Sequence, residues 1–168
     1  MQQVRALFEQ QDVLATLVVI LLVVVIAMMS PRIRDRVSGL GLAFVVLIAV
    51  VLAVTVPPPG GWGALADAEP SMKVLSACFT PHTWFTMQGL KYVNVLLFVL
   101  PALVLTVMTR RPVLSTLSLS ALAAGIEAWQ AFSNTRPCTG ADWIGGTLGV
   151  VIGVIMGITV INRTLEPA

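Results

Sequence analysis

The chain is dominated by five apolar runs, each about as long as a helix that crosses a bilayer. A hydrocarbon core about 30 Å thick needs roughly 20 helical residues. β-strands are much shorter than these runs, so their valine and isoleucine content does not indicate a sheet. The predicted helices cover about 13–29, 38–56, 91–109, 113–133 and 143–162. The pattern therefore predicts an all-α, polytopic integral membrane helix bundle that forms a single domain over residues 1–168.

The composition agrees with a membrane protein. Of the 168 residues, 57% are hydrophobic and 11% are charged, whereas soluble domains are about a quarter charged. So little charge cannot cover a water-exposed surface. The net charge of +2 comes without a basic patch interleaved with aromatic residues, which argues against nucleic acid as a partner. The N-terminal segment is a poor signal peptide, so we expect the first apolar run to be retained.

The loops differ in basic residues, and this difference predicts the orientation in the cell membrane. One side would hold Arg32, Arg34, Arg36, Arg110, Arg111 and Arg163. The other side would hold Arg5, Lys73, Lys91 and Arg136. Because the first group is larger and lies in very short loops, we expect the N-terminus outside and the C-terminus inside. The four tryptophans, Trp62, Trp84, Trp129 and Trp143, then fall near the outer interface.

Two cysteines, Cys78 and Cys138, both fall outside in this topology. An oxidising compartment permits a disulfide between them. The bridge would hold the long loop over the last helix pair. The alternative is two independent thiols.

Polar side chains that lipid should exclude are few, and they gather near the predicted outer face. Charged groups within a span are costly and usually functional. They come from three spans and one loop: Lys91, Asn94, Glu127, Gln130, Arg136 and Asp142. The two cations would meet an anionic group of a ligand, and Glu127 with Gln130 would bond its polar parts. The alternative is a polar network that only locks the helices together.

The last predicted helix carries a stripe of small residues. Gly145, Gly149, Gly153 and Gly157 recur at every fourth position, which predicts close helix packing within the bundle. Homodimerisation through the same stripe is the alternative. The lone histidine, His82, has no partners with metal-ligand spacing, and no phosphate-binding loop or nucleophile elbow occurs, so neither a metal nor a cofactor is expected.

The segment of about 91–157 resembles the VanZ-like family of membrane proteins. The resemblance rests on Glu127, Gln130, Arg136, Asp142 and Gly149 in their spacing, and on Asn94, Phe98 and Pro101 in the third span. Cys138, two residues after the arginine, resembles the version common in actinobacterial members. Gly146 stands where the family usually has Asn, and Thr139 where an acid is often seen.

The resemblance implies a helical membrane protein linked, in the family's namesake, with low-level resistance to teicoplanin. We expect a binding protein that recognises a lipid headgroup, a lipid-linked cell-wall precursor or a lipoglycopeptide at the outer face. The alternative is a membrane enzyme acting on an envelope lipid, with Glu127 and Asp142 as candidate catalytic residues and Glu127 as general acid or base. A transporter is disfavoured because no inverted repeat is recognisable.

Overall fold

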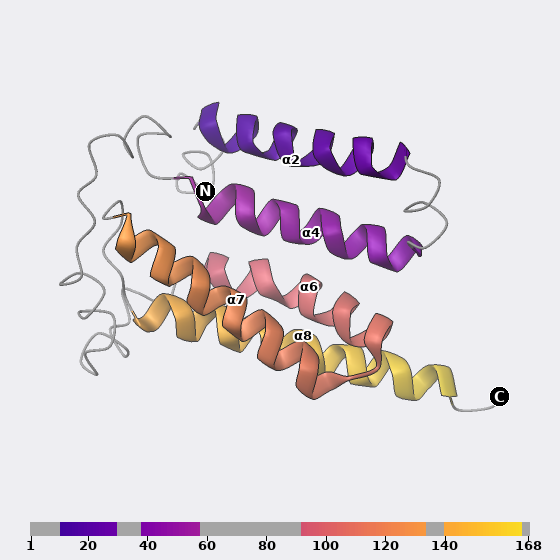
Figure 1. Cartoon of the computed structure of the whole chain (residues 1–168). Helices are drawn as coiled ribbons and strands as arrows, with labels where there is room; N and C mark the ends of the chain where they lie inside the picture. Colours follow the sequence, from indigo (N-terminus) through magenta and orange to yellow (C-terminus); the bar gives the residue numbers. More distant parts are fainter. Residues whose placement is uncertain (1–10, 30–37, 58–91, 134–139, 166–168) are drawn as a thin grey trace.

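The computed structural model describes residues 11–29, 38–57, 92–133 and 140–165. Within these ranges the chain forms five helices and no strand, which confirms the predicted all-α fold (Figure 1). The helices are α2 (Gln11–Met29), α4 (Gly39–Thr55), α6 (Tyr92–Thr109), α7 (Pro112–Phe132) and α8 (Gly140–Leu165).

The helix ends follow from local chemistry. The hydroxyl of Ser38 accepts a hydrogen bond from the Gly41 amide at 3.1 Å and caps the start of α4. Pro57, directly after the C-cap Val56, ends the same helix, because proline cannot donate a backbone hydrogen bond. Pro112 opens α7, a position where its missing N–H costs nothing. Helix α8 begins at Gly140, earlier than predicted, so that Asp142 lies within its first turn.

Successive helices run in opposite directions, so their ends gather at two ends of the bundle (Figure 1). One end holds the α6–α7 connection and the end of α8. We call it the arginine end, after Arg110, Arg111 and Arg163. The other, the carboxylate end, holds the end of α7 and the start of α8, with Glu127 and Asp142.

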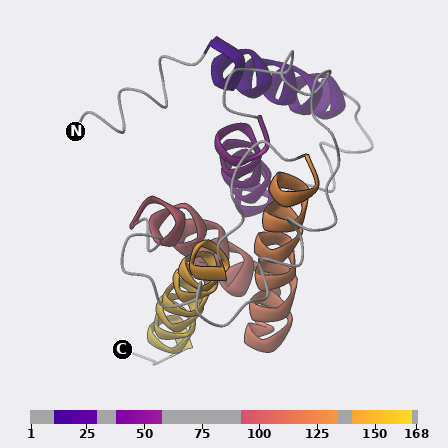
Figure 2. The same ribbon diagram turned by 90° about the vertical axis from the view of Figure 1, so that its left-hand side faces the viewer.

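Four helices enclose the core, while α2 lies beside α4 at the edge of the bundle (Figures 1 and 2). The buried residues that form this core are apolar: Val51, Phe98, Ala102, Leu119, Ala123, Ile126, Val150 and Val154. Pro101 lies within α6 and is itself buried against this core.

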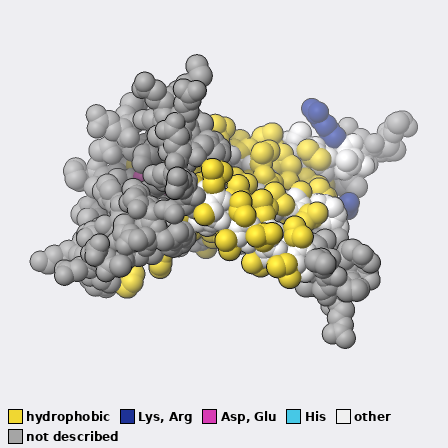
Figure 3. Space-filling model, turned by 90° about the horizontal axis from the view of Figure 1, so that it is seen from above, with side chains coloured by type: hydrophobic (Ala, Val, Ile, Leu, Met, Phe, Trp, Pro, Cys, Tyr) yellow, Lys and Arg dark blue, Asp and Glu magenta, His cyan; other side chains and the backbone are white. Residues whose placement is uncertain are grey.

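The face of the bundle seen in Figure 3 is apolar across its middle. Large side chains such as Ile26, Leu96 and Val113 are 65%, 69% and 70% exposed, which soluble monomers avoid over extended areas. Three helices, α6, α7 and α8, are long and apolar enough to cross a membrane, and shorter apolar stretches lie at Val13–Ile26 and Gly39–Thr55. The architecture is therefore that of a helical membrane bundle.

Helices α6 and α8 approach more closely than any side chain would allow. A Cβ atom added at Gly149 would collide with the carbonyl oxygen of Val95, and one at Gly153 would collide with that of Val99. At Gly157 an added Cβ would lie 2.8 Å from the Cβ of Thr106. The glycine stripe therefore faces α6 inside the bundle, and it brings the two backbones into contact.

Candidate functional site

The most specific polar contact of the bundle joins α6 to α8 at the carboxylate end. The side-chain amide Nδ2 of Asn94 donates a hydrogen bond to Oδ1 of Asp142 at 2.8 Å. Both residues lie in the first turn of their helices and are partly buried. Gly145 lies beside this pair, and a Cβ there would meet the Cβ of Asn94 at an ordinary contact distance of 3.7 Å. The pair was predicted to share one face of the membrane, and the structure brings it into direct contact.

Glu127 brings a third polar side chain to the same end, from α7. It lies between one and two turns before the end of that helix at Phe132. The residue is half-buried, and its Oε2 atom is buried. Three helices thus each supply a carboxylate or amide side chain to this end of the bundle.

Gln130 does not join this group; it faces α4. Its Nε2 donates to the backbone carbonyl of Thr55 at 2.6 Å, and the indole Nε1 of Trp129 donates to the carbonyl of Val56 at 3.2 Å. The last carbonyls of a helix have no partner within the helix. Two side chains of α7 therefore cap the end of α4. The binding role predicted for Gln130 stays a prediction, and in the structure its amide group holds two helices together.

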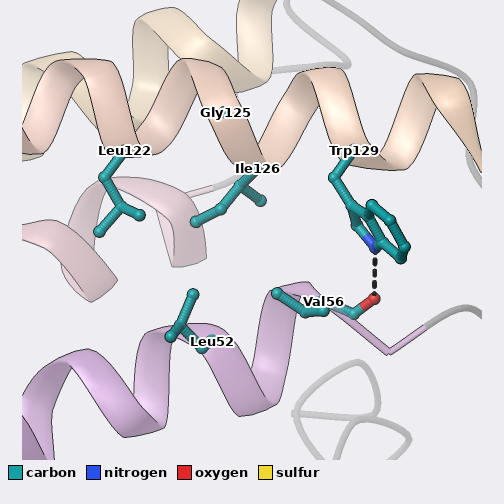
Figure 4. A pocket seen from close by; sticks show the side chains of 6 residues that line it. All are labelled: Leu52, Val56, Leu122, Gly125, Ile126 and Trp129. Atoms are coloured by element: carbon teal, nitrogen blue, oxygen red, sulfur yellow. Dashed lines mark hydrogen bonds between the residues drawn. The ribbon is translucent and has the colours of Figure 1, made fainter.

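An apolar groove lies beside these caps, between α4 and α7 (Figure 4). It has a volume of about 470 Å³ and is lined by Leu52, Val56, Leu122, Gly125, Ile126 and Trp129. The indole of Trp129, bound to the Val56 carbonyl, lies over one part of it. The groove opens on the side of α7 that faces α4, and its lining suits hydrocarbon.

The space around Gly146 is narrow. A Cβ at this position would lie 3.2 Å from the Cβ of Ala123 and 3.4 Å from the ring of Phe98. A larger side chain at this position would therefore press on Ala123 and on the ring of Phe98.

Comparisons with known family models, with curated proteins and with solved structures find no match.

Several predicted site residues lie outside the described part of the chain: Lys91, Arg136, Cys78 and Cys138. The lone histidine, His82, also lies outside it. Within the described ranges, no group of three or more His, Cys, Asp or Glu residues could hold a metal ion.

The sequence did not predict that side chains of one helix donate hydrogen bonds to backbone carbonyls of another. Trp143, expected only as an interfacial aromatic, donates from Nε1 to the carbonyl of Ser120 on α7 at 3.3 Å. A backbone acceptor leaves no mark in the sequence. For α4 a signal did exist, because the prolines after Val56 imply free carbonyls at the end of the helix.

Proposed function

We propose that this chain is a VanZ-like membrane protein of the cell envelope that binds a lipid-linked precursor or glycopeptide-type ligand at its carboxylate end. We place this end outside the cell, with the N-terminus outside and the C-terminus inside. The Asn94–Asp142 hydrogen bond carries the proposal, because it orients a carboxylate between two apolar helices.

The Asn94–Asp142 pair could serve ligand binding as well as helix packing. A carboxylate offers about four acceptor positions, so Asp142 can bond Asn94 and a ligand group together. The bond from Asn94 fixes the orientation of Asp142 before any ligand arrives, which lowers the entropic cost of binding. Glu127 adds a second carboxylate from α7, and both suit the hydroxyl, amide and amine groups of sugars and peptides.

The residues outside the described ranges complete the proposal. Arg136 and Lys91 would meet the anionic part of a lipid-linked ligand, such as its phosphates, since guanidinium groups bind phosphate with two parallel hydrogen bonds. A disulfide between Cys78 and Cys138 would hold the long loop near this site. Capture of a glycopeptide or of its target at the membrane would give low-level resistance of the teicoplanin type.

The second candidate function is an enzyme that acts on an envelope lipid. The buried Oε2 atom of Glu127 favours it, because shielding from water is typical of a general acid or base. Glu127→Gln separates the two functions. An enzyme would lose turnover but keep binding, whereas a binding protein would show no turnover in either form.

The proposal is tested by titrating the protein in nanodiscs with a lipid-linked cell-wall precursor and, separately, with teicoplanin. Asp142→Asn keeps an acceptor for Asn94 but removes the charge, so we expect folding to persist and affinity for one of these ligands to fall about tenfold, or about 1.4 kcal/mol. Thr159→Ala is the matched control, because Thr159 is exposed and its hydroxyl bonds only the Ile155 carbonyl of its own helix. Unchanged affinity in Asp142→Asn would refute the proposal.

A further inference from the structure

The arginine end has a built feature that the proposed function does not use. Helices α6 and α7 are joined by two residues, Arg110 and Arg111, and both are exposed. Arg110 has a φ of 54°, in the left-handed region that residues other than glycine rarely adopt. Arg163 lies in the last turn of α8, and α8 ends at the same end of the bundle (Figure 1).

Hydrogen bonds fix the backbone of this arginine pair. The amide of Arg110 donates to the Thr106 carbonyl at 2.8 Å, and the amide of Arg111 donates to the hydroxyl of Thr109 at 3.2 Å. The carbonyl of Arg111 accepts from the amide and the hydroxyl of Ser115, at 3.0 and 3.1 Å. The turn is therefore held in one conformation, so a ligand would have to order only the two side chains.

The positive charge here has no acidic counterpart nearby among the described side chains. Glu127 and Asp142 both lie at the carboxylate end. The first turn of α7 contains no acidic residue, although Arg111 is its N-cap and the start of a helix already carries partial positive charge. An anionic surface would offset this accumulation of like charge.

Directly beyond the pair, α7 presents an exposed apolar stripe. Val113, Leu114 and Leu117 are 70%, 51% and 65% exposed. Two cations on an ordered backbone turn, at the edge of a hydrocarbon-facing stripe, match a phospholipid, which has its anionic headgroup above its acyl chains. We propose that Arg110 and Arg111, together with this stripe of α7, bind an anionic phospholipid. The guanidinium groups donate hydrogen bonds to the headgroup phosphate, and the acyl chains lie along Val113, Leu114 and Leu117.

This site lies at the opposite end of the bundle from the Asn94–Asp142 pair, so it does not depend on the proposed function. The test is native mass spectrometry of the full chain released from detergent, titrated with phosphatidylglycerol or phosphatidylcholine. We expect the wild-type chain to retain phosphatidylglycerol at least tenfold more strongly. Arg110→Asn/Arg111→Gln should abolish the difference, since asparagine tolerates the left-handed conformation while the charge is lost.

Arg163→Gln is the matched control, because it removes one charge at the same end but from a different helix, and it should leave the preference intact. Arg111→Gln alone, which leaves Arg110 in place, should lower the preference at least threefold even if the double variant folds poorly. Equal retention of the two lipids by the wild-type chain would overturn the proposal. So would a double variant that still prefers phosphatidylglycerol, or an Arg163→Gln variant that loses the preference as fully as the double variant does.

Discussion

At the scale of single residues, the Asn94–Asp142 pair is the main polar feature of the carboxylate end. The sequence shows Asn94 and Asp142 as polar interruptions in two apolar helices, 48 residues apart along the chain. Burying either polar side chain alone would cost free energy, because it would lose its hydrogen bonds to water. The hydrogen bond between the two side chains offsets that cost for both. The same contact fixes the rotation of α6 relative to α8 at their first turns.

Breaking this bond should destabilise the fold modestly. For Asn94→Leu we expect a loss of about 1 kcal/mol in the free energy of unfolding, the usual scale for side-chain hydrogen bonds in membrane proteins. Asp142→Asn should lose less, because an asparagine oxygen still accepts from Asn94. Unfolding by sodium dodecyl sulfate, followed by circular dichroism, measures both.

The exchanged double variant, Asn94→Asp/Asp142→Asn, provides the control for this prediction. It reverses the direction of the bond and should recover most of the stability lost in Asn94→Leu. A double variant as unstable as Asn94→Leu would contradict the pairing.

At the scale of the helices, two interfaces use different means. Helix α8 meets α6 through backbone contact along the glycine stripe, whereas α7 meets α4 through side chains that cap the free carbonyls of α4. The stripe was readable because small residues recur at every fourth position. The sequence did not predict the caps, because nothing in it indicates which helix Gln130 and Trp129 face.

Alanine substitutions along the stripe should separate the close contacts from the ordinary ones. Gly149→Ala places a Cβ against the carbonyl of Val95, so we expect a loss of about 2 kcal/mol from overpacking. Gly145→Ala should be neutral or stabilising by up to about 1 kcal/mol, because its Cβ would meet Asn94 at an ordinary 3.7 Å and alanine favours helices. The same unfolding assay compares them, and equal effects at the two positions would argue against the backbone contact.

At the scale of the whole molecule, the alternating directions of the helices place the described arginines at one end and the described carboxylates, Glu127 and Asp142, at the other. The loop charges predict that the arginine end lies in the cytoplasm. The arrangement of the helices determines which helix ends lie together. The distribution of Lys and Arg among the loops is what predicts which of these ends faces the cytoplasm.

Reporter fusions test this orientation. Green fluorescent protein fused after the last residue should fluoresce, and alkaline phosphatase at the same point should be inactive, because we expect the C-terminus inside. Fusions after Phe132, at the carboxylate end of α7, should give the opposite pair of results. The reverse pattern would place the candidate site in the cytoplasm and remove its access to envelope ligands.

The sequence by itself determined the helices and the stripe, since both depend on local pattern. Run length and hydropathy give the spans, and proline gives the end of α4. Only the tertiary structure decided that Asn94 bonds Asp142, that Gln130 turns to α4, that Phe98 and Ala123 fill the space beside Gly146, and that Arg110 takes a left-handed conformation. These depend on how each helix is rotated and how closely it meets its neighbours, and apolar residues on every side of a membrane helix leave that rotation weakly encoded.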